Sequence, residues 1–278
     1  MTTKAAPAGW WGQFHFQPGV MGILNVTPDS FSDGGVFLDP SRAVAAGLEM
    51  AAAGAALIDI GGESTRPGAV PVTPVEEQAR ILPVIAGLRD ASVPISVDTR
   101  NASTMAAALD AGATVVNDVS GLTYDPAAAA LVAARRCPVA LMHMRGTPVT
   151  MKALAQYDDP VADVIRELGH RVAAARAAGV ALAQIAVDPG IGFAKDASHN
   201  VAILQGLSAL DVFGCIILVG LSRKRFIGAL SATTCERDRD AGSLAAGLFA
   251  LSQGARVLRV HDVASTVRAV HVWQALAG

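Results

Sequence analysis

Acidic and amide side chains stand where short apolar runs of the sequence end. Asp98 follows Ile-Ser-Val, Asn117 follows Thr-Val-Val, and Asp188 follows Ile-Ala-Val. Carboxylate and amide oxygens accept hydrogen bonds, and a carboxylate can take two N–H donors from one amidine-like edge. These residue types predict a pocket for a flat heterocycle that is rich in N–H donors.

Basic groups lie at or near the ends of other runs of the same kind and suit an anion. They are Arg66, Lys224, Arg259 and His261, and such a set is typical of phosphate recognition. Asn25 has hydroxyls and Asp33 nearby in the sequence, and the side chains of this segment offer oxygen ligands for Mg²⁺. From the residues alone, we expect a heterocycle that bears a phosphate or a diphosphate.

The apolar runs that carry these groups recur eight times along the chain. Most are continuously apolar rather than alternating, which is typical of strands covered on both faces. We therefore predict buried parallel strands. The runs are residues 20–24, 56–60, 94–97, 114–116, 138–142, 184–187, 215–219 and 256–260.

Ala-rich stretches with helical spacing alternate with these runs. Several begin with a capping residue and proline, as at Thr73-Pro74 and Asp125-Pro126, and several end at glycine, as at Gly112. The predicted helices are residues 41–53, 74–89, 101–111, 126–135, 159–178, 200–207, 240–253 and 264–276.

Eight strand–helix units in 278 residues fit the size of a (β/α)8 TIM barrel, an α/β fold of about 250 residues. The sequence contains no GxGxxG motif, which an open doubly wound sheet would normally show. We predict an N-terminal extension over residues 1–17 and a single barrel domain over 18–278. A lone Asp after a strand is usually a turn or cap residue, but eight polar run ends on one rim favour a polar ligand.

Composition excludes several other classes of protein. The formal net charge of −2 argues against a mainly electrostatic nucleic-acid binder. Mean hydropathy is +0.41, yet the chain lacks a run of about 18 apolar residues that would span a membrane. The three cysteines are far apart, so we expect neither disulfides nor zinc. We expect a cytoplasmic protein with no signal peptide, in which Trp10, Trp11, Phe14 and Phe16 form an apolar flap.

Two long segments, residues 21–35 and 59–69, resemble the signature loops of the dihydropteroate synthase family. Shorter segments resemble its other blocks, and they occur in the family's order. They are Ser-Val-Asp-Thr from Ser96, Asn-Asp-Val-Ser-Gly from Asn117, Met-His-Met-Arg-Gly-Thr-Pro from Met142, Asp-Pro-Gly-Ile-Gly-Phe from Asp188, Ser-Arg-Lys from Ser222 and Arg-Val-His-Asp from Arg259.

The resemblance implies a transferase of folate biosynthesis. Such an enzyme condenses 6-hydroxymethyl-7,8-dihydropterin diphosphate with 4-aminobenzoate, giving 7,8-dihydropteroate and diphosphate. It also implies a (β/α)8 barrel, dependence on Mg²⁺, a homodimer and a sulfonamide target. An alternative is a non-catalytic paralogue or a pterin- or methyltetrahydrofolate-binding barrel. That alternative needs no diphosphate site, so Arg66, Lys224 and Arg259 favour the synthase.

The resemblance also implies a role for each residue of the site. Asp98, Asn117, Asp188 and Lys224 hold the pterin, and Met142 packs on its face. Asn25 binds Mg²⁺, while Thr65, Arg66, Arg259 and His261 hold the diphosphate. Ser222 and the helix after it meet the carboxylate of 4-aminobenzoate, whose pocket Phe31, Pro67 and Phe193 shape. Arg66, Lys224, Arg259 and His261 are thus the expected catalytic residues, and displacement is expected to be dissociative.

Three further expectations concern residues and helices outside the substrate-binding set. His143 and Arg145 can be either site residues or structural ones. Glu63 and Asp59 are expected to orient the second signature loop through hydrogen bonds. The Ala-rich helices at residues 240–253 and 264–276 are the expected dimer interface.

Overall fold

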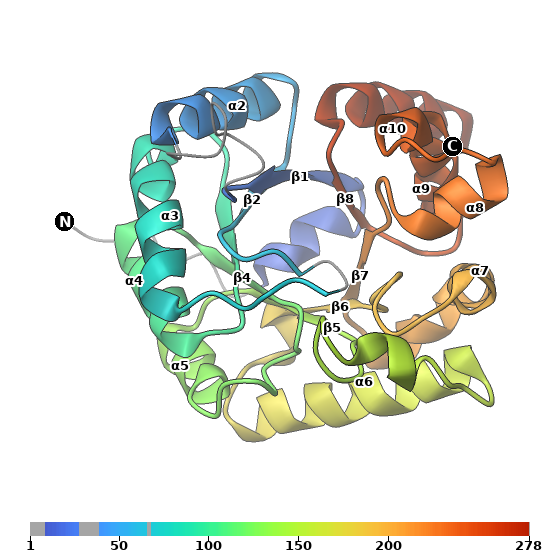
Figure 1. Ribbon diagram of the computed structural model, residues 1–278, viewed down its shortest axis with the longest axis horizontal. Coiled ribbons are helices and arrows are strands. Elements are labelled where there is room, and N and C mark those ends of the chain that lie inside the picture. The colour runs from blue at the N-terminus through green and yellow to red at the C-terminus, as the bar shows by residue number, and fades with distance from the viewer. Residues whose placement is uncertain (1–8, 28–38, 66–67, 278) are drawn as a thin grey trace.

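Eight parallel strands close into a barrel in chain order in the computed structural model, which describes residues 9–27, 39–65 and 68–277. Figure 1 shows helices around the strands. The predicted barrel and the eight predicted strands are confirmed, with ends shifted by one or two residues. The strands are β1 (Gly19–Asn25), β2 (Leu57–Gly61), β3 (Ile95–Asp98), β4 (Val115–Asp118), β5 (Val139–Met142), β6 (Ile185–Asp188), β7 (Ile216–Gly220) and β8 (Val257–Val260).

Nine α-helices occur in the described part of the chain. Eight match the predicted ones. The additional helix, α8, has seven residues and no side-chain cap hydrogen bond, so its sequence carries little helix signal. The helices are α2 (Pro40–Ala52), α3 (Pro74–Leu88), α4 (Ala102–Ala111), α5 (Ala128–Arg135), α6 (Pro160–Ala177), α7 (Ala197–Gln205), α8 (Arg225–Ser231), α9 (Asp240–Ser252) and α10 (Val263–Ala277).

Capping residues start several of these helices. The hydroxyl of Thr73 accepts from the N–H of Glu76 at 3.2 Å, and Pro74 fills the first turn of α3. Asp125 was predicted to cap a helix that begins at Pro126, and the structure shows a different arrangement. Its carboxylate accepts from the N–H groups of Ala102 and Ala127, and α5 begins at Ala128 rather than Pro126. Gly112 ends α4 with φ of +127°, as its position predicted.

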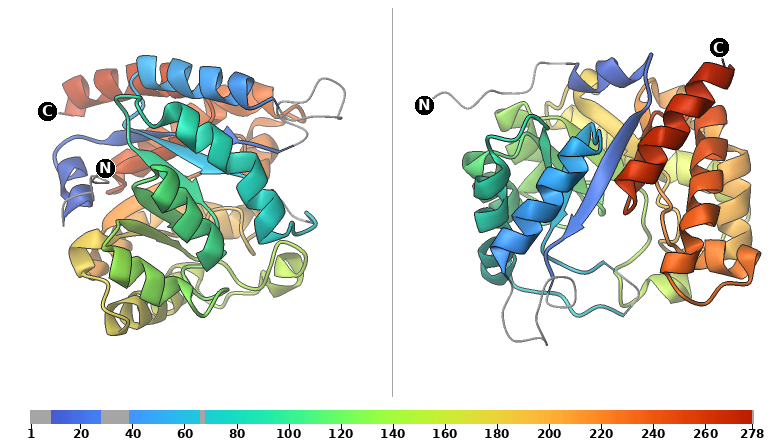
Figure 2. Two further views of the ribbon diagram at one scale, coloured as in Figure 1. Left: turned by 90° about the vertical axis from the view of Figure 1, so that its left-hand side faces the viewer. Right: turned by 90° about the horizontal axis from the view of Figure 1, so that it is seen from above.

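A short 3₁₀ helix, η1 (Trp10–Phe14), closes the end of the barrel where the strands begin. Figure 2 shows it opposite the loops that follow the strands. Trp11 and Phe14 are buried against Met21 and Leu57, and the indole N–H of Trp11 donates to the carbonyl of Gln184 at 2.9 Å. The predicted apolar flap is confirmed for these rings. It is wrong for Phe16, which is 91% exposed.

Strand register brings the predicted polar residues to one rim. Asn25 is paired with Gly61, Gly61 with Asp98, and Asp98 with Asn117. These four positions therefore form one level near the carboxyl ends of β1 to β4. No helix among the described residues is long and apolar enough to cross a membrane.

Candidate active site

Arg259 lies at the centre of the site and is held by two carboxylates from other strands. Its Nε is 2.6 Å from Oδ2 of Asp59, and its Nη2 is 2.7 Å from Oδ2 of Asp98. The amide of Asn117 also donates to Oδ2 of Asp59 at 3.0 Å. Four strands thus contribute to one hydrogen-bonded group, which the predicted separation of acids from bases on the rim did not anticipate.

Burial sets the charge state of this group. It raises the pKa of Asp98 to about 7, because the charged form loses water, although the Arg259 guanidinium opposes the shift. Burial alone would lower the pKa of Arg259, but Asp59 and Asp98 raise it above its usual value. Oδ1 of Asp59 is buried and has no hydrogen-bond partner within the part of the chain that the structure describes. A donor on a ligand would satisfy this oxygen.

Asp188 and Lys224 lie on the other side of Arg259. Oδ1 of Asp188 accepts from the N–H of Gly190 at 2.7 Å. Gly220 lies between the two side chains, because a Cβ placed on it would be 3.8 Å from the other oxygen of Asp188 and 3.7 Å from Cβ of Arg259. Burial raises the pKa of Asp188 and lowers that of Lys224 to about 8, and the attraction between the two charges opposes both shifts.

Ser222 and His261 come together between β7 and β8. The Ser222 hydroxyl lies 3.0 Å from Nδ1 of His261 and accepts from its backbone N–H at 3.2 Å. The neighbouring Arg223 turns away to pair with Asp240 of α9 at 2.7 Å. Helix α8 begins immediately after Lys224, which places its first turn beside this pair.

The second signature loop is fixed at both ends by polar contacts. Glu63 and Arg100 form a buried ion pair at 2.9 Å, so the prediction that Glu63 orients this loop is consistent with the structure. Asp59 bonds Arg259 and Asn117, and its carboxylate has no hydrogen bond to the described residues of the loop. Its predicted role in orienting the loop therefore stays a prediction. The N–H of Gly68 donates to the carbonyl of Pro148 at 2.9 Å, which ties the loop to the segment after β5. Thr65 lies between these contacts and is partly buried.

Part of the predicted site lies outside the described residues. This applies to Arg66 and Pro67 of the second loop and to Phe31 and Asp33 of the first. Asn25 is described and ends β1 at the same rim. No group of three or more His, Cys, Asp or Glu that could hold a metal occurs in residues 9–27, 39–65 and 68–277. A Mg²⁺ ion often takes only one or two protein oxygens together with substrate phosphates and water, so Asn25 fits that type of site.

An apolar cluster forms one wall beside the acids. Met142, which pairs with Asp188 in the sheet, packs with Met144, Met151 and Ala194, and Phe193 packs against them. The Nζ of Lys224 is 4.7 Å from the centre of the Phe193 ring and donates to the carbonyl of Ile191. The predicted positions of Met142 and Phe193 next to the polar pocket agree with this arrangement.

His143 and Arg145 belong to a structural network. His143 is fully buried, its Nε2 lies 3.0 Å from Glu167 of α6, and Arg145 pairs with the same carboxylate. Sequence reasoning left both possibilities open for these residues. It missed Lys195 altogether. The one indication in the sequence was that a lysine follows β6 in a chain that has only four lysines. It also missed Asp59 as a site residue, although an Asp inside the apolar run of β2 was a signal.

A family model described as pterin binding enzyme matches residues 21–261 of this chain. That span contains strands β2 to β8, most of β1 and every residue of the site described above. The chain therefore belongs to the family of pterin-binding enzymes.

Relatives within that family narrow the comparison. The dihydropteroate synthase of Synechocystis sp. is 44% identical over 267 residues, which are 96% of this chain and 91% of the relative. A solved structure of Xanthomonas albilineans dihydropteroate synthase with 4-aminobenzoic acid is 49% identical, covers 94% of both chains and has a TM-score of 0.89. The same enzyme in complex with 7,8-dihydropteroate is 47% identical, with a TM-score of 0.85 and 94% of both chains covered. Within the family, the chain is thus grouped with the dihydropteroate synthases.

Proposed function

We propose that this protein condenses 6-hydroxymethyl-7,8-dihydropterin diphosphate with 4-aminobenzoate to give 7,8-dihydropteroate and diphosphate. The observation that carries the proposal is the buried set of Asp98, Asn117 and Asp188 around Arg259 at the barrel rim. The X. albilineans relative, which holds 7,8-dihydropteroate, supports this choice of substrate class.

The acids bind the pterin and stabilise the charge that it develops. Asp98 and Asp188 offer acceptors to the N–H edge of the heterocycle, and the amide of Asn117 adds a donor and an acceptor. When the bond to diphosphate breaks, positive charge on the methylene spreads into the pterin ring. Two buried carboxylates beside that ring stabilise the cation more strongly than water would.

The basic groups stabilise the leaving diphosphate. Arg259, His261 and Arg66 are proposed to bind its oxygens, and Lys224 adds a positive charge at the same end of the barrel. Arg259 is held by Asp59 and Asp98, so its position is fixed before the substrate arrives. Such preorganised charge lowers the barrier because nothing must reorganise during the reaction.

Ser222 and the first turn of α8 are proposed to bind the carboxylate of 4-aminobenzoate. The aniline nitrogen then attacks the methylene, and Phe193 orients the ring. Because the methylene cation is delocalised into the pterin ring, we infer a dissociative displacement without a covalent enzyme intermediate. An aniline is nucleophilic at neutral pH, so the attack requires no strong general base. Mg²⁺, proposed to bind at Asn25 and the diphosphate oxygens, would supply further charge neutralisation to the leaving group.

Mixing both substrates with Mg²⁺ tests this function. We expect equal amounts of diphosphate and 7,8-dihydropteroate, measured by a coupled diphosphate assay and by mass spectrometry. The alternative is a pterin-binding barrel without synthase activity. It predicts measurable pterin binding with no diphosphate release, and that result would contradict the proposal.

We also propose that the protein is a homodimer that acts in the cytoplasm. A groove of about 340 Å³ between α7, α8 and α9 is lined by apolar side chains, among them Phe226, Leu230 and Phe249. Leu230 and Phe249 are exposed in the single chain. The groove is lined by the predicted α9 together with α7 and α8, and no described residue of the other predicted helix, α10, is among its lining residues. Light scattering after gel filtration should give a molecular mass twice that of one chain. The Phe249→Glu variant should instead give the mass of a single chain.

A sulfonamide should compete with 4-aminobenzoate for this site. A Yersinia pestis dihydropteroate synthase solved with a sulfonamide drug is 44% identical to this chain, with a TM-score of 0.88. We expect the drug to raise the apparent KM for 4-aminobenzoate without lowering kcat. Inhibition that high 4-aminobenzoate fails to relieve would contradict a shared pocket.

A further inference from the structure

Lys195 is a buried lysine that the proposed mechanism does not use. It lies in the loop between β6 and α7, it is 9% exposed, and it is one of four lysines in the chain. A buried ammonium costs free energy unless it is fully hydrogen-bonded. Its partners therefore indicate what it does.

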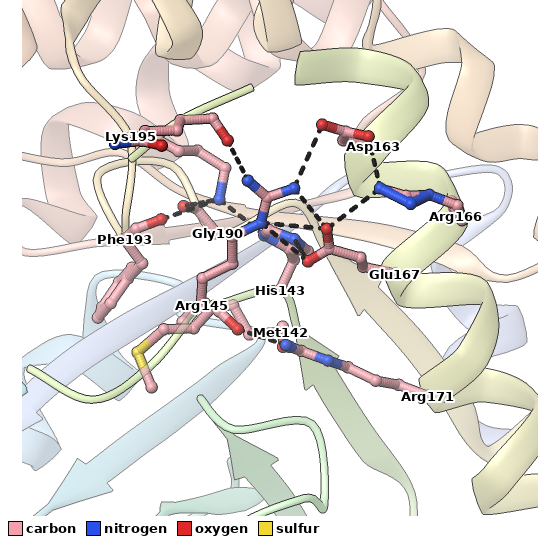
Figure 3. A network of polar contacts seen from close by, with 12 residues as sticks. Met142, His143, Arg145, Asp163, Arg166, Glu167, Arg171, Gly190, Phe193 and Lys195 are labelled. Carbon is pink, nitrogen blue, oxygen red and sulfur yellow. Dashed lines mark hydrogen bonds and ion pairs between the residues drawn. The ribbon is translucent and has the colours of Figure 1, made fainter. Parts of the chain in front are cut away.

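The Nζ of Lys195 has three partners within hydrogen-bonding distance. They are Nδ1 of His143 at 2.8 Å and the carbonyl oxygens of Gly190 and Phe193, each at 3.0 Å. Figure 3 shows these contacts between the loop after β6 and the end of β5. Nζ of Lys195 thus connects the imidazole of His143 with two carbonyl groups in the backbone of one loop.

The protonation state of His143 is consistent with a hydrogen bond between its ring and Lys195. Its Nε2 lies 3.0 Å from Oε2 of Glu167, and Arg145 holds the same carboxylate. Burial lowers the pKa of His143 to about 4, so the ring is neutral and carries one proton. With the proton on Nε2, the ring donates to Glu167 and presents the Nδ1 lone pair to Lys195. Burial also lowers the pKa of Lys195, and the nearby Asp188 opposes that shift.

The loop that Lys195 holds has an unusual backbone. Gly190, Gly192 and Ala194 have φ values of +68°, +83° and +51°, and a non-glycine residue adopts this left-handed region only at a cost. A Cβ on Gly190 would lie 1.9 Å from the carbonyl oxygen of His143, so the loop lies directly against the end of β5. The loop carries Phe193, whose ring lies beside Nζ of Lys224.

We propose that Lys195 is a positioning residue, which anchors the loop after β6 to His143 and so fixes Phe193 in the wall of the 4-aminobenzoate pocket. This inference rests on the proposed function. We expect its main effect on one substrate, because the backbones of Asp98, Asn117 and Asp188 belong to strands β3, β4 and β6. Among the described residues, the side chains of the polar pterin residues hydrogen-bond to the loop only through the contacts of Asp188 with Gly190 and of Lys224 with Ile191.

Lys195→Met tests the proposal, because it keeps an unbranched side chain of similar length and removes all three contacts of Nζ. We expect the KM for 4-aminobenzoate to rise about tenfold or more, while the KM for the pterin diphosphate and kcat change by less than about threefold. The matched control is Lys152→Met, since Lys152 is exposed on the 3₁₀ helix η2 (Met151–Leu154). It should change both KM values by less than about twofold.

A double-mutant cycle shows whether the effect passes through Phe193. In a Phe193→Ala background, Lys195→Met should raise the KM for 4-aminobenzoate little further. The proposal is overturned if the two effects multiply, if both KM values rise equally, or if Lys195→Met leaves the KM for 4-aminobenzoate within twofold of wild type.

Two further measurements keep the result decisive. If Lys195→Met does not fold, His143→Gln removes the imidazole acceptor instead. It should raise the KM for 4-aminobenzoate about threefold or more, and an unchanged KM would overturn the proposal. If the wild type forms no dihydropteroate, the proposed function fails first. Equilibrium titration of 4-aminobenzoate onto protein that holds pterin and inorganic diphosphate then gives the same comparison without turnover.

Discussion

The carboxylates of the site owe their properties to burial among strands that the chain brings together from distant positions. Arg259 is 200 residues from Asp59 and 161 from Asp98, yet it bonds both. The apolar run before each of the acids Asp98 and Asp188 predicted that the acid would lie at the carboxyl end of a strand, on the rim. The pairing itself depends on barrel closure between β8 and β1, which no local pattern encodes. Asp59 was therefore missed as a site residue, although Asp98, Asn117 and Asp188 were correctly placed at the rim.

Asp188→Asn and Asp188→Ala separate the charge of this residue from its loop contact. Asn keeps an acceptor for the N–H of Gly190 and removes the negative charge, whereas Ala removes both. We expect Asn to weaken pterin binding about tenfold or more and Ala to abolish it, measured by calorimetric titration. Asp211→Ala, at an exposed position of η4 (Leu207–Phe213), is the control and should bind normally. Unchanged affinity in Asp188→Ala would refute the assigned role.

The kcat/KM for the pterin diphosphate should show a bell-shaped dependence on pH. Asp98 is proposed to act as a carboxylate, and its pKa is raised to about 7, so activity should fall as pH drops through that value. Lys224 is proposed to act as an ammonium, and its pKa is lowered to about 8, so activity should fall as pH rises through that value. These limbs report the free enzyme. Lys224→Arg should move the alkaline limb to higher pH. An alkaline limb that stays in place would exclude Lys224 as its origin.

Arg259→Ala should affect both catalysis and stability. Loss of charge stabilisation is expected to lower kcat by about 10²-fold or more. Two buried carboxylates lose their counter-charge, which should cost about 3–5 kcal/mol of unfolding free energy. Urea unfolding and steady-state kinetics measure the two effects. Lys224→Ala should show a similar loss in kcat without unpairing Asp59 and Asp98. Turnover that survives in both variants would rule out their catalytic roles.

At the scale of the elements, loops determine how the strand ends become a site. The strands were predictable because each is a short apolar run between turn residues, and most helices because caps and glycines mark their ends. The loop after β6 was not predictable. Its backbone depends on contacts with His143 and Lys224 from other elements. Helix α8 was missed as well, because its seven residues lack a side-chain cap.

Gly190→Ala tests how closely this loop must approach β5. The new Cβ would meet the carbonyl of His143 at 1.9 Å, so the loop must move and the KM for 4-aminobenzoate should rise. Gly214→Ala is the matched control, because Gly214 has a similar φ of +62° with no atom within 4 Å of the added Cβ. It should cost about 1–2 kcal/mol of stability from backbone strain and leave both KM values unchanged. Equal kinetic effects of the two variants would show that strain alone is responsible.

For the whole molecule, the two ends of the barrel differ in their chemistry. The rim at the carboxyl ends of the strands carries the charged groups. The other end is closed by η1, whose rings pack on the inner strand residues. High hydropathy and few charges thus reflect strands covered on both faces, and no helix that could span a membrane is present among the described residues.

Trp11→Ala should test the closure of that end. The ring is fully buried and its N–H is bonded to Gln184, so truncation should cost about 3–5 kcal/mol in urea unfolding while leaving both KM values unchanged. Phe16→Ala, at an exposed ring, should cost less than about 0.5 kcal/mol. A stability loss of the same size in both variants would argue against η1 as a specific plug.

A crystal structure of the protein with dihydropterin diphosphate tests the central claim most directly. The account predicts the N–H edge of the pterin on Asp98, Asn117 and Asp188, and the diphosphate against Arg259 and His261. A pterin bound elsewhere on the barrel, or a diphosphate that contacts neither Arg259 nor His261, would contradict it.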